Sequence, residues 1–316
     1  MVVKALPTLL QNDETLREPG TIGRRRFLRT VGMAPMGALM AQPSTISSTT
    51  WGALAEARKY RKIDCHNHVW LSPRHEPRRI VEAADRLYIE RIVISLPVGD
   101  TPDGFRESNN KVLQAMKEFP SRLLGQCFLN PAYPREAMEE MTRCLGEGMV
   151  GLGELYTQVK INDPLYHPFI EKSIELKAPI LMHARADLGM LRPGYRNAAP
   201  RGTSRASDFV EVARRYPEAI LIHAHIGGGG DWEYMCKTLR AAPTVYLDTS
   251  GSVTDEGMVD FAGRYLGAKR LLFATDLNFE SGVGKILAAG LTEQERRMIF
   301  FENYNNILRQ RGLHAN

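Results

Sequence analysis

Short apolar runs alternate with amphipathic stretches along the chain from residue 61 onward. The apolar runs are rich in β-branched and aliphatic residues, as expected of buried strands. Eight such runs occur, at residues 61–66, 91–96, 123–129, 149–154, 179–183, 219–225, 244–248 and 270–276. The stretches between them repeat apolar residues every three or four positions, and this pattern predicts helices over 136–145, 164–176 and 207–216.

This alternation predicts eight consecutive βα units. Helix-start signals support it, because Asp163 precedes Pro164 and Thr292 stands three residues before Glu295. Right-handed crossovers between parallel strands close most naturally into a single-domain α/β structure, the (β/α)₈ TIM barrel, over residues 56–316. A doubly wound open sheet remains the alternative, since periodicity does not reveal whether a sheet closes.

The first 55 residues have a different pattern. Arg24, Arg25, Phe27 and Leu28 precede a weakly apolar stretch, and Ala53-Leu54-Ala55 offers a small-residue cleavage site. This order resembles a twin-arginine signal peptide followed by a linker. The resemblance implies recognition by the twin-arginine export machinery and a periplasmic or secreted enzyme. The alternative is a disordered basic tail.

Composition narrows the possible functions. The chain is 43% hydrophobic and 24% charged, which suits a globular protein with a sizeable core. Its net charge of +5 resides mostly in residues 1–55, so we expect no nucleic-acid binding by the barrel. No stretch approaches the roughly 18 consecutive apolar residues of a spanning helix, so the mature form is not expected to be embedded in a membrane.

Candidate metal ligands lie where the predicted strands end. In barrel enzymes that end of the strands carries the active site. His-x-His at residues 66–68 places two imidazoles on one side of an extended chain, within reach of one ion. The full predicted ligand set is His66, His68, Glu154, His183, His225 and Asp276.

The chain resembles the amidohydrolase superfamily, specifically its amidohydrolase-related branch, which includes decarboxylases and lactonases. The resemblance covers roughly residues 61–311. The matching segments are Asp64-Cys65-His66-Asn67-His68, Met182-His183, His225-Ile226-Gly227-Gly228 and Ala274-Thr275-Asp276. It implies a divalent metal, one or two ions, with Zn²⁺ the expected ion, and Asp276 as the group that exchanges protons with water and substrate.

Two of these positions allow more than one role. Glu154 ends the fourth strand, where dinuclear relatives carry a bridging carboxylate, but it could instead orient a ligating histidine. His225 matches the family pattern and either binds metal or acts on the substrate. His223 lies two residues earlier, so the pleat is expected to turn both side chains into the barrel, with His223 as a buried core histidine.

We expect a hydrolase that uses metal-activated water on a small polar or anionic amide, lactone or ester. Arg185, two residues beyond His183, is the expected contact for the anion, and it begins a long connection that follows the fifth strand. A metal-dependent decarboxylase of the same family is the first alternative. A non-catalytic barrel that retains a metal is the second.

Overall fold

The protein is described by a computed structural model that covers residues 48–156, 159–185 and 202–316. The twin-arginine motif and most of the long connection after Arg185 lie outside these residues. None of the helices in the described part is both long and apolar enough to span a membrane.

Eight parallel strands follow one another around the sheet in sequence order, each hydrogen-bonded to the next. The strands are β1 (Ile63–His68), β2 (Arg91–Ser95), β3 (Leu123–Cys127), β4 (Gly151–Leu155), β5 (Ile180–Met182), β6 (Leu221–His223), β7 (Tyr246–Asp248) and β8 (Leu271–Leu272). All eight predicted strands are confirmed. Several end earlier than predicted, so His225 and Asp276 lie in the loops just beyond β6 and β8.

Two backbone hydrogen bonds close this sheet into a barrel. The amide of Cys65 donates to Phe273 O at 3.0 Å, and the amide of Asp276 donates to His66 O at 2.9 Å, which joins β1 to the segment after β8. The predicted single-domain (β/α)₈ barrel is therefore confirmed, and the open-sheet alternative is wrong.

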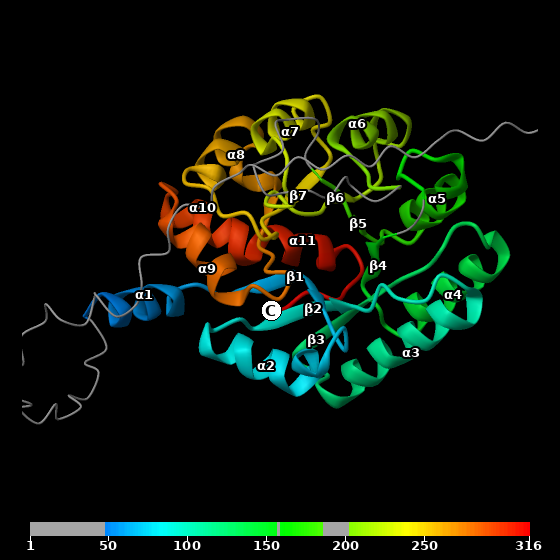
Figure 1. Cartoon of the computed structure of the whole chain (residues 1–316), viewed down its shortest axis with the longest axis horizontal. Helices are drawn as coiled ribbons and strands as arrows, with labels where there is room; N and C mark the ends of the chain where they lie inside the picture. Colours follow the sequence, from blue (N-terminus) through cyan, green and yellow to red (C-terminus); the bar gives the residue numbers. More distant parts are fainter. Residues whose placement is uncertain (1–47, 157–158, 186–201) are drawn as a thin grey trace, which may run out of the picture. The chain divides into compact units, whose positions relative to one another are not determined.

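Helices surround the strands (Figure 1). They are α1 (Ser48–Arg58), α2 (Pro77–Arg86), α3 (Pro102–Glu118), α4 (Pro134–Gly146), α5 (His167–Glu175), α6 (Ala206–Arg215), α7 (Trp232–Leu239), α8 (Met258–Leu266), α9 (Phe279–Ala288), α10 (Glu293–Arg297) and α11 (Asn303–Arg309). Short 3-10 helices occur at η2 (Pro73–His75), η3 (Pro164–Tyr166) and η4 (Ala268–Arg270), and η5 (Met298–Glu302) is a short π-helix. The predicted caps are present, because Asp163 accepts from the amide of Leu165 and Thr292 forms a capping box with Glu295.

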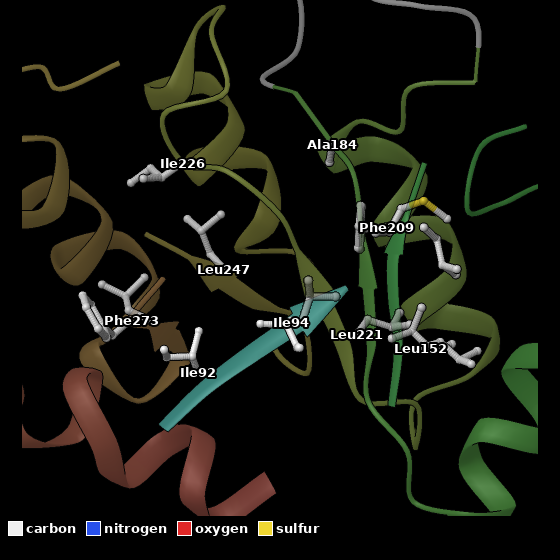
Figure 2. Close-up of a cluster of buried hydrophobic side chains, with 14 of the residues drawn as sticks. Ile92, Ile94, Leu152, Ala184, Phe209, Leu221, Ile226, Leu247 and Phe273 are labelled. Atoms are coloured by element: carbon white, nitrogen blue, oxygen red, sulfur yellow. The ribbon is translucent and has the colours of Figure 1, made fainter. Parts of the chain in front are cut away.

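The alternation of side chains along the strands divides the core into two layers. Ile92 and Ile94 of β2 belong to the larger cluster between strands and helices, which Figure 2 shows together with residues of β4, β6, β7 and helix α6. Val93, between them, belongs to the smaller cluster inside the barrel.

Helix α11 closes the end of the barrel at which the strands begin. Tyr304, Ile307 and Leu308 join the interior cluster, and Arg311 donates to Met149 O, just before β4. In Figure 1, α11 lies within the ring of helices, next to β1. The opposite end, where the strands finish, is left for the functional site.

Candidate metal centre

All six predicted ligand residues meet at the end of the barrel where the strands finish. The described residues include three sets of potential metal ligands, and within each set the ligand atoms lie within 4.8 Å of one another. These sets are His66 with His68 and Asp276, His66 with His225 and Asp248, and Glu154 with His183 and His225. Residues from six different strands or strand ends thus converge on one small volume.

Glu154 is the centre of this group. Its Oε1 lies 2.7 Å from His183 Nδ1 and 3.0 Å from His225 Nε2, and its Oε2 lies 3.5 Å from His66 Nε2 and 3.4 Å from His68 Nε2. Burial raises the pKa of Glu154, but the imidazoles of His183 and His66 outweigh it and hold the pKa well below its usual value. The carboxylate is ionised, and each of its oxygens faces a different pair of histidines.

Asp276 lies on the open side of the group. Its Oδ1 is 3.3 Å from His68 Nε2, its Oδ2 is 3.9 Å from His225 Nδ1, and its side chain is 27% exposed, compared with 5% for Glu154. The backbone of Asp276 has a φ of 45°, a left-handed conformation uncommon outside glycine. Helix α9 takes Asn278 as its N-cap, so Asp276 is not a capping residue.

Asp248 is a member of the site that the sequence reasoning missed. It is fully buried, and its Oδ2 accepts from His66 Nδ1 at 2.8 Å. Its Oδ1 accepts from the amides of His225 and Ser250, both at 2.9 Å, and from Ser250 Oγ at 2.6 Å. Burial raises the pKa of Asp248, but the bonds to these partners, His66 first, lower it to about 2. The sequence did contain a signal for this role of Asp248, because the residue ends the seventh predicted strand.

These hydrogen bonds determine which ring nitrogen of His66 and which ring nitrogen of His225 faces the centre of the site. An ionised Asp248 only accepts, so His66 carries its proton on Nδ1 and turns the lone pair of Nε2 towards the site. Ser250 gives its only hydroxyl proton to Asp248 and therefore accepts from His225 Nδ1, at 2.8 Å. The Nε2 of His225 then faces Glu154 Oε1, at 3.0 Å.

The converging lone pairs and charges fit a divalent cation. His66 Nε2 is completely buried and has no hydrogen-bond partner among the described residues. Glu154, Asp248 and Asp276 bring three carboxylates to the site, and buried negative charge is costly unless a cation compensates it. Burial lowers the pKa of His66 and Glu154 raises it, with a net shift well above the usual value, so without an ion Nε2 also carries a proton, which an ion must displace before the lone pair is free. A set of imidazole and carboxylate donors suits zinc, manganese or iron.

A hydrogen-bond network beneath the centre joins the two ends of the barrel sheet. Asp64 accepts from the amide of Thr275 at 3.0 Å and from its hydroxyl at 2.5 Å, and it also accepts from Asn67 Nδ2. Asn67 Oδ1 accepts from the amide of Leu277 at 3.0 Å. Burial raises the pKa of Asp64 to about 7. The register of β1 and β2 shifts between Asp64 and Asn67, and the network holds this irregular segment of β1 against the loop that carries Asp276.

His223 does not face the barrel interior, so that expectation was wrong. Its ring packs on Phe209 of α6, with ring centroids 4.8 Å apart, and its Nδ1 donates to Ala224 O at 2.8 Å. The predicted role as a buried core histidine is confirmed. The pleat turns His223 towards the helices, whereas the loop after β6, with a φ of 64° at residue 225, redirects His225 to the centre.

Arg185 follows β5 at the rim of the barrel. Its Nε donates to Gly228 O at 2.8 Å, and its backbone amide donates to Ser204 O at 3.1 Å. These bonds fix its position between the loops after β5 and β6, and its contact with a substrate anion stays a prediction. Arg192, Arg196 and Arg201, further along the same connection, lie outside the described residues.

Known structures share this barrel at low sequence identity. The 2,6-dihydroxybenzoate decarboxylase from Rhizobium is 18% identical, with 80% of this chain and 100% of that chain covered and a TM-score of 0.62. The 5-carboxyvanillate decarboxylase from Sphingomonas paucimobilis is 17% identical, with 79% and 99% covered and a TM-score of 0.61. A manganese-bound dihydroxybenzoic acid decarboxylase from a Polaromonas species is 20% identical, with 79% and 97% covered and a TM-score of 0.62. No curated protein matches the chain.

Sequence comparison provides the classification. The family model described as amidohydrolase matches residues 63–303, from the first residue of β1 to the first residue of α11. The matched segment contains every residue of the metal centre. With eight parallel strands, a ligand set at their carboxyl ends and a family match over most of its length, this chain belongs to the amidohydrolase family.

Proposed function

We propose that the protein is a metal-dependent decarboxylase that acts on an aromatic or unsaturated carboxylic acid. Three of the similar structures are decarboxylases of substituted benzoic acids, and one of them binds manganese. The observation in this chain that carries the proposal is the pair His225 and Asp276. The two side chains lie 3.9 Å apart, and Asp276 is on the open side of the site.

The metal would be held by His66, His68, His183 and Asp276, with Glu154 between the histidines. When bound, a divalent cation supplies positive charge that holds substrate oxygen atoms and stabilises the negative charge that develops on them. Asp248 keeps His66 in the tautomer that leaves Nε2 free to bind, and Ser250 does the same for His225.

The remaining chemistry is a proton transfer. The bond between the carboxyl carbon and the substrate carbon breaks, carbon dioxide leaves, and the electron pair stays on the substrate carbon. His225, next to Asp276, is the group placed to transfer a proton taken up from water to that carbon. Arg185, fixed on Gly228, is placed at the rim to contact the anionic substrate.

Hydrolysis is the second candidate, and Glu154 favours it. Each oxygen of this carboxylate faces its own pair of imidazoles, which is the arrangement expected of a carboxylate that bridges two ions. A two-ion site would activate water for attack on an amide, a lactone or an ester.

The two candidates differ in products. Metal-loaded protein incubated in deuterated water with a set of hydroxybenzoic acids should release carbon dioxide and leave one deuterium at the vacated carbon, observed by NMR. His225→Asn should abolish this incorporation of deuterium. His167→Asn, on helix α5 away from the metal centre, should leave it unchanged. Hydrolysis of lactones or amides without loss of carbon dioxide would refute the decarboxylase and establish the hydrolase.

A further inference from the structure

We propose that Tyr156 is a specificity-determining residue of the metal centre and that its ring packs against the body of the substrate. This inference rests on the proposed function, in which the acid group of the substrate is bound at the metal. Tyr156 directly follows β4, at the end of the barrel where the candidate ligands converge. A ring contact with His183 and the open surface of the same tyrosine ring carry the assignment.

The open side of the metal centre is bounded by His183 and Asp276. Their side chains are 20% and 27% exposed. The side chains of the other four candidate ligands are at most 6% exposed, namely His66, His68, Glu154 and His225. A substrate that enters from the solvent therefore reaches a bound cation past His183 or Asp276, and the residues that flank these two side chains are placed to contact it.

Tyr156 flanks His183. The two ring centroids lie 4.2 Å apart, with an angle of 55° between the ring planes. The backbone holds the pair together, because the amide of His183 donates to Leu155 O at 2.9 Å and joins the end of β4 to the end of β5. Leu155 packs in the core between strands and helices, so strand alternation turns Tyr156 to the opposite side, as it does Glu154. The tyrosine ring therefore lies one step nearer the mouth of the barrel than Glu154.

Tyr156 keeps part of its surface open to a ligand. The residue is 38% exposed, although His183 covers one part of its ring. An aromatic ring attracts a second planar ring in an offset or edge-on arrangement, beyond what the burial of apolar area provides. A saturated ring of the same size buries a similar area and lacks this electrostatic contribution. With the acid group held at the metal, Tyr156 should therefore favour planar acids over saturated acids of the same charge.

Calorimetry on the metal-loaded full chain at neutral pH tests the proposal, with benzoate as the planar acid and cyclohexanecarboxylate as the saturated acid of the same charge and ring size. We expect benzoate to bind about fivefold more tightly, which corresponds to about 1 kcal/mol. Tyr156→Leu keeps an apolar side chain and removes the aromatic ring, so it should abolish this preference and leave cyclohexanecarboxylate binding within about twofold. Tyr156→Phe keeps the ring and should retain the preference.

Tyr133→Leu is the matched control. Tyr133 is 36% exposed, lies in the connection between β3 and α4, and makes no side-chain capping hydrogen bond at the start of that helix. Its replacement should leave the preference for benzoate unchanged. The same loss of preference in Tyr133→Leu would overturn the proposal in favour of unspecific apolar contact at the rim.

Other results would also overturn the role of Tyr156. Equal affinities of the parent protein for the two acids, or no binding of benzoate, would show that the ring does not select planar acids. An equal weakening of both acids in Tyr156→Leu would do the same, and weaker metal binding in a chelator competition would identify the cause as a displaced His183. Because binding is measured without turnover, a preference for benzoate in a protein that releases no carbon dioxide would separate failure of the proposed function from failure of the role of Tyr156.

Discussion

Asp248→Asn should weaken metal binding while preserving the fold. The amide oxygen of asparagine can replace Oδ1 and keep the donors from His225 and Ser250, which bond to that atom alone. The amide nitrogen then replaces Oδ2 and meets the N–H of His66 Nδ1, where two donors face each other. His66 must transfer its proton to Nε2, and the lone pair that pointed into the centre is lost.

The magnitude follows from this single changed contact. Loss of a group that orients a ligating histidine typically weakens metal binding about ten- to a hundredfold, or about 1.4 to 2.8 kcal/mol. In the metal-free protein a hydrogen bond to a charged acceptor, worth about 1.5 to 3 kcal/mol, is replaced by one between neutral groups, worth about 0.5 to 1.5 kcal/mol. We therefore expect a lower melting temperature without metal as well as a weaker affinity.

Titration with Zn²⁺ or Mn²⁺ against a competing chelator at neutral pH measures the affinity, and circular dichroism verifies folding. Asp255→Asn is the control, because Asp255 follows the same strand and accepts from Trp232 Nε1 at 2.9 Å outside the metal centre. An Asp248→Asn protein that folds normally and binds metal as tightly as the parent would refute the assigned role of Asp248 and the tautomer of His66.

Three further predictions concern stability and metal content. Burial lowers the pKa of His223 to about 4, so between pH 6.5 and 4 the unfolded chain binds a proton that the folded chain does not. The free energy of unfolding of the metal-free protein should therefore fall by up to about 1 kcal/mol per pH unit over this range. His223→Gln should flatten this pH dependence in denaturant titrations, and an unchanged slope would contradict the prediction. Gly251→Ala should destabilise the protein by more than about 1 kcal/mol, the cost of overpacking, because a Cβ at this position would lie 2.3 Å from Gly227 C. Gly257→Ala, also at positive φ but in open space, should destabilise it less. Equal melting temperatures of the two variants would refute the close packing of these loops. Glu154→Gln should lower the metal content measured by elemental analysis, and retention of the parent content would place Glu154 outside the ligand set.

The prediction of the fold from sequence succeeded for a local reason. Each βα unit carries its own signal, namely a short apolar run followed by an amphipathic stretch. This signal can be recognised in the sequence without knowing which elements the unit packs against. The ends of the strands were less accurate. The last predicted strand extends to Asp276, but β8 stops at Leu272, because the residues beyond it bond to β1 and to Asp64 and not to a regular ladder.

The ligand residues could be predicted because they end apolar runs. His66, His183 and Asp276 each stand at such an end, and a barrel brings all these ends to one rim. Asp248 obeys the same rule, but a single aspartate after a strand is also a common capping residue, so its role required the distance to His66. His223 was misplaced because a period of two describes only the regular part of the strand.

The amino-acid sequence by itself determined the eight βα units, the family and the set of residues from which a metal centre could be built. Tertiary structure alone decided the closure of the barrel, the orientations of the His66 and His225 rings, and the central position of Glu154. The physical reason is the separation along the chain over which each kind of interaction acts. Hydrophobic periodicity acts between residues a few positions apart, whereas a hydrogen bond such as that from His66 to Asp248 joins residues 182 positions apart, and only the folded chain brings them within 2.8 Å.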